Sequence, residues 1–378
     1  MSRAAHVEDE ATPSLADFTV ACICPLGVEC AAVEGMLDEI YDPLPTPRDQ
    51  NAYTFGRLGQ HNVVVAVMPQ IGNNAAATTA TQVLNDFPSL RFGLLVGIGG
   101  GVPDESRTEN DEETHRNSDI RLGDVVVSKA TDVSGGVVQY DLGKRLVDGS
   151  FQRTGHLNKP PAVLSANVKR LESQHRRVGN QIRDNLRAML KRYPTMRREY
   201  QHPGIQEDRL FRADYTHSSG ATCEGCDKDR TVRRRVRSDT DPRIHYGTIG
   251  SANVVVKSAK MREALRKDMG ILCVEMEAAG LMDTFPCLAI RGICDYADSH
   301  KNKRWQPYAA ATAAAYMKDL LMIIPPHQVK ETIKAQEGIQ AALGAVLDAL
   351  EEPVAKIGKQ VDQLHNEQEG RLTFILET

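Results

Sequence analysis

Two short acidic segments carry the residues with the clearest chemical potential in this sequence. Residues 274–278 (VEMEA) place two carboxylates, Glu275 and Glu277, directly after an apolar run, and residues 291–298 (RGICDYAD) end the next run with Asp295. Open α/β sheets bind their ligands at the carboxyl ends of strands. Because neighbouring carboxylates repel each other unless they are hydrogen-bonded, we interpret the two segments together as a site for acid–base chemistry. For either segment alone, a helix cap or a polar core group is the alternative.

A glycine run and one further acid complete the set. Residues 97–101 (GIGGG) follow another apolar run, and a backbone without side chains can approach a ligand closely. Val102 breaks the G-x-G-x-x-G pattern, and the sequence contains no G-x-x-x-x-G-K-[ST], which excludes dinucleotide and P-loop motifs. Glu29 lies in the first turn of an expected helix, a position in which the helix macrodipole favours an acidic residue.

The elements that must position these residues alternate between short apolar runs and helical patterns over residues 16–326, which is typical of an α/β layer structure. A hairpin is expected between the runs 53–58 and 62–68. The other strands are expected at 18–24, 92–96, 124–128, 245–249, 271–274 and 287–294, and helices at 29–37, 75–84, 258–267 and 308–321, with one more starting at Met276.

The charge of the chain is strongly segregated. The 378 residues include 46 Lys+Arg and 50 Asp+Glu, a net charge of −4, yet residues 153–245 alone hold 21 basic and 11 acidic residues. This basic stretch suits a polyanion such as a phosphorylated small molecule; a solvated surface segment is the alternative. Interleaved aromatic residues that would favour nucleic acid are missing from it, so nucleic acid is not the expected partner.

The composition also indicates in which cellular compartment the protein is expected. No apolar run approaches the roughly 20 residues of a membrane span, and the N-terminus has no hydrophobic signal region. Six of the eight cysteines lie in apolar segments, as expected for buried thiols in a reducing compartment. We therefore expect a cytoplasmic protein without a membrane partner.

Composition shifts divide the chain into parts. Residues 1–15 are expected to be a disordered N-terminus, and residues 16–326 a single domain that carries an acidic loop at 103–119 and a basic insertion at 150–243. After Pro326, residues 327–378 show apolar positions at coiled-coil spacing, which Pro353 should kink or interrupt. This tail is either a seam for self-association, a linker to a further module, or an amphipathic helix packed on the domain.

A cysteine pair in the insertion is the only candidate metal site in the sequence. Cys223 and Cys226 are spaced C-x-x-C, and His217 precedes them. Because only three ligands are visible and no second C-x-x-C exists, a thiol clasp or a disulfide is an equal alternative, and no metal or cofactor is expected for the chemistry.

The two acidic segments resemble those of the purine nucleoside phosphorylase and methylthioadenosine/adenosylhomocysteine nucleosidase superfamily, over about residues 16–324 apart from the insertion and acidic loop. Residues 122–129 (LGDVVVSK) and 293–305 (ICDYADSHKNKRW) resemble in particular the domains that open many fungal NLR-type immune receptors. The resemblance implies a three-layer α/β fold with a central mixed, partly barrel-like sheet, to which the basic insertion and a C-terminal helical appendage are added. It also implies a homo-oligomer.

The resemblance further implies roles for individual residues. Asp295 would protonate or hydrogen-bond N7 of a purine, and Glu29 would activate water for attack on the sugar. Met276 would pack under the ribose, whose hydroxyls Glu277 would hold. The remaining residues of the expected substrate site are Glu275, Ile98, Gly99, Gly100, Asn253 and Val254, with Asn253 standing where the family often stacks an aromatic ring.

The resulting interpretation is an N-glycosidase that releases a purine base, expected to be adenine from ATP or another 5′-phosphorylated adenosine, in immune or stress signalling. Phosphorylases use an arginine near residues 25–29 and a hydroxyl residue in the glycine run, but this sequence has no basic residue there and has Ile98 in the run. A phosphorylase and a catalytically silent nucleotide-sensing or oligomerisation module are the alternatives. Candidate 5′-phosphate ligands are Lys301, Lys303, Arg304, Arg209 and Arg212.

Overall fold

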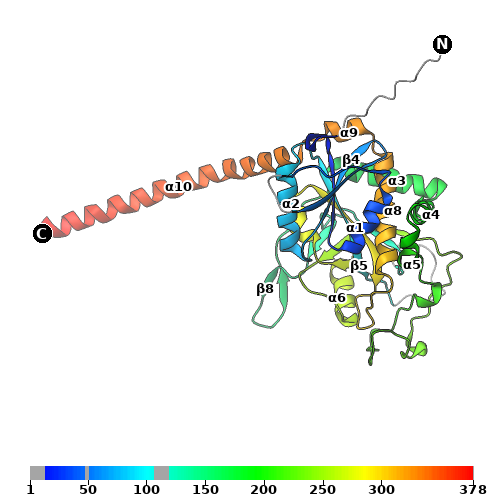
Figure 1. The fold of residues 1–378 in the computed structure, drawn as a ribbon. Coiled ribbons are helices and arrows are strands. Elements are labelled where there is room, and N and C mark those ends of the chain that lie inside the picture. The colour runs from blue at the N-terminus through cyan, green and yellow to red at the C-terminus, as the bar shows by residue number, and fades with distance from the viewer. Residues whose placement is uncertain (1–12, 47–50, 106–118, 378) are drawn as a thin grey trace, which may run out of the picture. The chain divides into compact units, whose positions relative to one another are not determined.

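The computed structural model describes residues 13–46, 51–105 and 119–377 and divides into an α/β unit that ends at Lys334 and a helical unit from Ala335 onward (Figure 1). The division lies after the expected boundary at residue 326, because the short helix α9 (Pro326–Glu331) still inserts Val329 into the core of the α/β unit. Most of the expected disordered N-terminus and of the acidic loop lies outside the described residues. In the described part of the chain, no helix is long and apolar enough to cross a membrane.

A mixed sheet forms the centre of the α/β unit, as expected. Five strands, in the order β11, β10, β6, β12 and β5, close into a barrel because β11 also pairs with β5. From β5 the sheet continues through β1, β4, β3 and β2, and β7 pairs with β10. The strands are β1 (Val20–Cys24), β2 (Glu39–Ile40), β3 (Ala52–Leu58), β4 (His61–Val67), β5 (Phe92–Gly101), β6 (Val125–Ser128), β7 (Val137–Gln139), β10 (Ile244–Ser251), β11 (Ile271–Glu275) and β12 (Cys287–Asp295).

The glycine run belongs to strand β5, which the sequence predicted to end at residue 96. β5 continues to Gly101, pairing in parallel with β12 and, at Gly100 and Gly101, antiparallel with β11. A Cβ on Gly97 would lie 2.3 Å from a guanidinium nitrogen of Arg291. Glycine therefore allows β5 to pass close to buried polar side chains at the point where the barrel closes.

Helices cover both faces of the sheet (Figure 1). On one side α8 (Gln306–Ile323) contacts α1 (Gly27–Met36), α3 (Ala162–Val178), α4 (Ile182–Arg192) and α5 (Arg197–Tyr200), and on the other α2 (Asn73–Asp86) contacts α7 (Ala278–Met282). The helix α6 (Ala259–Met269) packs on β11. Four short 3-10 turns, η1 (Leu15–Asp17), η2 (Pro194–Met196), η3 (Ile205–Glu207) and η4 (Lys228–Arg230), and a small hairpin of β8 (Gly143–Arg145) and β9 (Phe151–Arg153) complete the described part of this unit.

The helix α8 is buried almost all round, and its small side chains explain how. Alanines from Ala309 to Ala315 let it approach the sheet so closely that a Cβ on Gly292 of β12 would lie 1.8 Å from the carbonyl oxygen of Ala309. Close packing of α8 on β12 thereby holds the strand that ends in Asp295.

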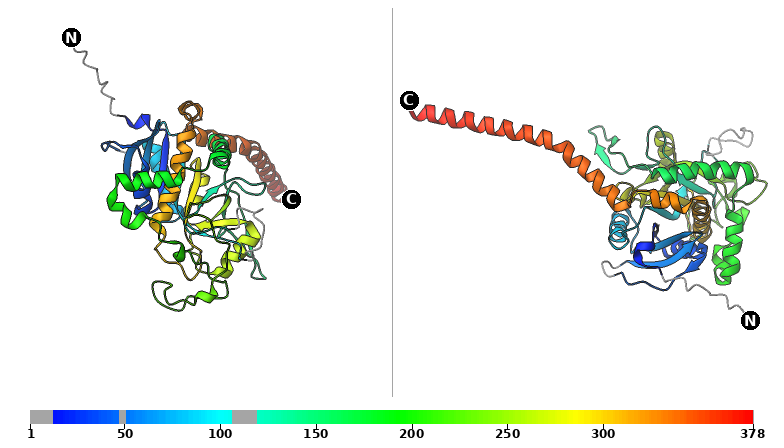
Figure 2. Two further views of the ribbon diagram at one scale, coloured as in Figure 1. Left: turned by 90° about the vertical axis from the view of Figure 1, so that its right-hand side faces the viewer. Right: turned by 90° about the horizontal axis from the view of Figure 1, so that it is seen from above.

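Helices within the expected insertion belong to the main core. Apolar side chains of α3 and α4, including Leu164, Leu171, Leu186 and Met189, are buried in the same cluster as α8. Figure 2 shows these green helices beside the orange α8. Apart from short turns, the insertion is irregular at residues 154–161 and in its later part, between α5 and β10.

The second unit is the single helix α10 (Ala335–Glu377), which includes Pro353. The sequence predicted a kink or an interruption at Pro353. The helix continues through this residue, which leaves the kink, because a proline inside a helix removes one hydrogen bond and bending can absorb its steric clash. The apolar positions Leu343, Val346, Leu350 and Ile357 are at least half exposed. Self-association, linkage to a further module and packing on the domain all remain alternatives for this seam.

Candidate active site

Glu29 is a buried carboxylate held by backbone amides at the start of α1. Its side chain is 2% exposed, and its two oxygens accept hydrogen bonds from the N–H of Leu26 at 2.6 Å and from the N–H of Ile98 in β5 at 2.7 Å. Burial raises the pKa of Glu29 from 4.5 to about 8, although Arg291 and the two amides oppose the shift. Such a carboxyl group can exchange a proton near neutral pH.

The two acids that follow β11 have different tasks. Glu275 accepts hydrogen bonds from the N–H groups of Glu277 and Ala278 and so caps the start of the short helix α7. For this one acid, the helix-cap role is the alternative that the sequence analysis gave. Glu277 turns toward α2, where one of its oxygens accepts from the N–H of Gly72 at 3.1 Å. Met276 lies between them and is partly buried.

Arg291 of β12 neutralises this pair of acids. Its guanidinium group, which is fully buried, donates hydrogen bonds to the carboxylates of Glu275 and Glu277 and also lies near Glu29. Burial, and to a lesser extent Glu275, nevertheless raises the pKa of Glu277, while Arg291 opposes the shift. The site thus balances three buried carboxylates against one fixed cation, an arrangement stable only while the hydrogen bonds are intact.

Asp295 ends β12 on the other side of the glycine strand. It is 4% exposed, accepts from the N–H of Ala297 at 2.9 Å, and forms an ion pair of 3.0 Å with Lys301. Ala297 has a φ of 51°, in the left-handed region, and a Cβ on Gly100 would lie 2.9 Å from Asp295 Oδ1. The left-handed conformation at Ala297 and the absence of a side chain at Gly100 therefore fix the position of the Asp295 carboxyl group.

The glycine strand is what brings the candidate catalytic residues together. Ile98 of β5 meets Glu29, Gly100 meets Asp295, and Gly99 lies against the backbone of Val274 just before Glu275. Ile98 is partly buried. Residues that are far apart in the sequence thus converge on one short segment of backbone, where an acid and a base can act on one substrate.

The start of α2 adds polar groups to the site that the sequence analysis did not include among the site residues. The N–H of Asn73 donates to Oδ1 of Asn253 at 2.9 Å, and Oδ1 of Asn73 accepts from Ser251 and from the N–H of Gly280. Asn253 is exposed but fixed by this bond and by its own N–H, which donates to Asp141. The exposed Val254 accepts from Tyr140 through its carbonyl oxygen. The sequence signal that could have indicated this contribution is the pair Gly72–Asn73, which directly precedes an alanine-rich helix.

The candidate phosphate ligands have different surroundings. Lys301 pairs with Asp295, and Arg304 pairs with Glu207 at 2.5 Å. A cavity of about 200 Å³ is lined by Asp295 together with Arg209, Lys303 and Arg304. Arg212 is exposed and does not line this cavity.

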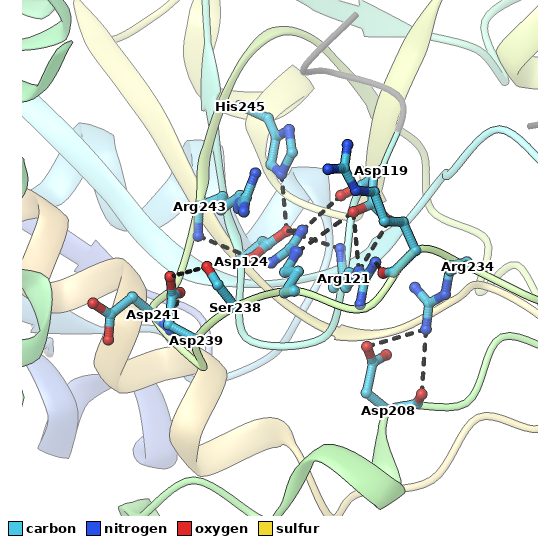
Figure 3. Close-up of polar contacts among 12 residues, drawn as sticks. Asp119, Arg121, Asp124, Asp208, Arg234, Ser238, Asp239, Asp241, Arg243 and His245 are labelled. Atoms are coloured by element: carbon cyan, nitrogen blue, oxygen red, sulfur yellow. Dashed lines mark hydrogen bonds and ion pairs between the residues drawn. The ribbon is translucent and has the colours of Figure 1, made fainter. Parts of the chain in front are cut away.

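Part of the charge of the basic insertion is used to anchor it. Arg234 pairs with Asp208 at 3.0 Å, and Asp124 accepts a hydrogen bond from His245 at 2.9 Å (Figure 3). Arg237 donates two further hydrogen bonds of 2.7 Å to Asp124. Although burial raises the pKa of Asp124, the contacts with Arg237 and His245 lower it well below its usual range. The local excess of basic residues therefore overstates the charge that is available to a ligand.

Comparisons with known proteins agree with this architecture. The family described as "Phosphorylase superfamily" matches residues 194–322, which include β10, β11, β12 and α8. This part of the chain is therefore similar to the phosphorylase superfamily. A nucleotide-binding leucine-rich repeat (NLR)-like protein of Hyaloscypha variabilis is 44% identical over 322 residues, 84% of this chain but 31% of that protein, so the chain spans about a third of this relative.

Nucleosidases are similar to this domain at lower sequence identity. A 5′-methylthioadenosine/S-adenosylhomocysteine nucleosidase of Mycobacterium bovis is 24% identical over 315 residues and covers 81% of this chain and 97% of its own. The structure of futalosine hydrolase of Helicobacter pylori aligns with a TM-score of 0.50 and 15% identity over 81% of this chain and 97% of its own. A nucleosidase of S. pneumoniae aligns with a TM-score of 0.50 and 16% identity over 82% and 100%. These structures share the fold.

Proposed function

We propose that this domain hydrolyses the N-glycosidic bond of purine nucleosides or nucleotides and releases the free base. The observation that carries the proposal is the placement of Glu29, a buried carboxyl group of α1 with a pKa of about 8. Its side chain contacts Ile98 of β5, and Asp295 contacts the same strand two residues further on, at Gly100. A base that removes a proton from water works best when its pKa is near the working pH. The nucleosidases with which this domain shares its fold support the reaction class.

In this mechanism each carboxyl group acts on a different part of the substrate. Asp295 would share a proton with N7 of the purine, so that the base leaves as the bond to the sugar lengthens. Glu277 would accept the ribose hydroxyls at the oxygen lone pairs that Arg291 and Gly72 do not use. Glu29 would take the proton of the attacking water, and Met276 would pack under the sugar.

Hydrolysis is favoured over phosphorolysis by the charge around Glu29. The segment 25–29 contains no cation, and the nearby guanidinium of Arg291 is already engaged by Glu275 and Glu277. An incoming phosphate would meet a carboxyl group, neutral or negative according to pH, where a phosphorylase needs a positive charge. Water carries no charge and meets no such barrier.

The substrate proposed here is a 5′-phosphorylated adenosine such as ATP. Support comes from the cavity beside Asp295, because its lining includes Arg209, Lys303 and Arg304, which can donate charge-assisted hydrogen bonds to phosphate oxygens.

We further propose that the domain acts as a cytoplasmic homo-oligomer within an NLR-type protein, where cleavage of adenine nucleotides would serve immune signalling.

A product analysis tests the reaction. The chain is incubated with ATP, AMP, adenosine and methylthioadenosine, with and without inorganic phosphate, and free base and sugar products are separated by chromatography. We expect phosphate-independent release of adenine that is lost in Asp295→Asn and retained in Asp268→Asn, which changes an exposed carboxylate of α6. Release that requires phosphate would identify a phosphorylase, and nucleotide binding without any release would identify a silent sensing module.

The phosphate preference is tested separately with two lysine variants. Lys303→Ala should raise KM for ATP about tenfold and leave KM for adenosine unchanged, because one charge-assisted contact is worth roughly 1.5–3 kcal/mol. Lys169→Ala, an exposed change on α3, is the matched control. An equal effect of Lys303→Ala on KM for both substrates would overturn the proposal that Lys303 binds the 5′-phosphates of the substrate.

A further inference from the structure

Four metal-ligating side chains meet where the irregular part of the insertion contacts the loop after β12. Three of them, His217, Cys223 and Cys226, belong to the insertion, and the fourth, His300, follows the Asp295 segment. The sequence shows a C-x-x-C pair with one histidine, whereas the fold supplies a second histidine from a segment more than seventy residues away. A complete set of two thiols and two imidazoles is typical of a structural zinc site.

The distances between these groups are close to those of a tetrahedral site. His217 Nδ1 lies 3.1 Å from Cys226 Sγ and 4.0 Å from Cys223 Sγ, and one ligand atom each of His217, Cys226 and His300 lie within 4.8 Å of one another. Zinc bonds of about 2.0–2.3 Å in tetrahedral geometry place neighbouring ligand atoms roughly 3.3–3.8 Å apart. Small rotations of the side chains would therefore bring them to bonding distance.

The state of His300 is the strongest sign of a missing partner. The residue is 7% exposed, its ring stacks on Phe211 at 4.0 Å, and neither ring nitrogen has a hydrogen-bond partner among the described residues. Buried polar groups are nearly always satisfied, so such an imidazole requires an explanation. A metal bond to one of its nitrogens provides it.

The outer contacts of both histidines fit metal ligation. His300 Nδ1 faces a carboxylate oxygen of Asp298 at 3.7 Å, and His217 Nε2 lies 3.0 Å from the carbonyl oxygen of Gly220. Metal-bound histidines usually donate their other ring N–H to a carboxylate or a carbonyl, which fixes the tautomer. The arrangement leaves His217 Nδ1 and His300 Nε2 for the metal.

We propose that His217, Cys223, Cys226 and His300 bind a structural Zn²⁺ ion that fastens the insertion to the loop carrying the catalytic acid. Thiolate and imidazole ligands favour Zn²⁺ over Mg²⁺ or Ca²⁺, which prefer oxygen. The joined segments already contact each other, since the N–H of His217 donates to Ser299 at 3.0 Å. Lys301, which pairs with Asp295, directly follows the proposed ligand His300.

Metal analysis of the purified full chain tests the site. We expect a single zinc ion per chain by inductively coupled plasma mass spectrometry after dialysis without chelator. Cys226→Ser and His300→Ala should lose it, whereas Cys30→Ser in α1 and the exposed His156→Ala should retain it. Removing zinc from the wild-type chain with a chelator should lower its Tm and should have no effect on the Tm of Cys226→Ser.

Cobalt substitution keeps the test decisive where a variant fails to fold. Wild-type protein stripped of zinc and titrated with Co²⁺ should develop the visible absorption of tetrahedral cobalt and a thiolate-to-cobalt charge-transfer band. Wild-type protein that contains no zinc and gives no such band would overturn the proposal, as would a disulfide between Cys223 and Cys226 in freshly purified protein. Neither readout depends on glycosidase activity, so this site and the proposed function can fail independently.

Discussion

Replacing Glu29 with glutamine tests the proposed base most directly. The substitution keeps the shape of the side chain but removes its ability to accept a proton. With a pKa of about 8, the carboxyl group of the wild-type chain is about one-tenth ionised at pH 7 and about nine-tenths ionised at pH 9. Because the base must be ionised to accept a proton, kcat/KM of the wild-type enzyme should rise about tenfold over this interval.

Glu29→Gln should lower kcat by roughly 100- to 10,000-fold, the usual contribution of a general base, and should remove the rise with pH. The assay is the initial rate of adenine release from ATP at pH 7, 8 and 9. Glu34→Gln is the matched control, because Glu34 lies on the same helix and accepts hydrogen bonds from Cys30 and Thr54. A Glu29→Gln variant within threefold of wild type, or a wild-type profile that is flat from pH 7 to 9, would refute the reasoning.

The same carboxyl group makes a separate prediction about stability. The pKa of Glu29 is higher in the folded chain than its ordinary value of 4.5, so its contribution is complete below pH 4.5 and is lost as the pH rises to 8. The free energy of unfolding of wild type, relative to Glu29→Gln, should therefore fall by about 2 kcal/mol between pH 6 and pH 8. Urea unfolding at both pH values measures this, and a constant difference would show that Glu29 is not protonated in its pocket.

Two further substitutions test how the site is held. Arg291→Leu should destabilise the chain by about 3–5 kcal/mol in urea unfolding, since it leaves the buried carboxylates of Glu275 and Glu277 without their cation; a loss below about 1 kcal/mol would contradict the ion-pair role. Gly100→Ala should reduce kcat at least tenfold because its Cβ would lie 2.9 Å from an oxygen of Asp295, and unchanged kcat would show that the acid can move freely.

Much of the fold follows from local pattern. Apolar runs predicted the central strands to within two residues, except for the end of β5, because a strand buried on both faces needs a continuous apolar sequence. The hairpin of β3 and β4 turns at Gly59 and Gln60, close to the expected position. The strands β2, β7, β8 and β9 were not predicted, since each is only two or three residues long and carries too little pattern to be seen.

The candidate site could be predicted in part. Acids at strand ends are visible in a sequence, but the partners that set their chemistry are not. Arg291 lies in an otherwise apolar strand, which is a signal of a buried ion pair, yet only the barrel closure shows that it meets Glu275 and Glu277. Lys301 was assigned to phosphate, whereas the fold pairs it with Asp295.

The sequence by itself determined the types of chemistry available to this protein: carboxyl groups that follow apolar runs, a glycine-rich run, and a cysteine pair. Tertiary structure decided which of these groups act together. Packing the start of α1 against β5 buries Glu29 and raises its pKa, and folding the insertion onto the loop after β12 brings His300 to the cysteines. The physical reason is that desolvation and ligand geometry depend on distances between segments that are remote in the chain, and local sequence does not encode those distances.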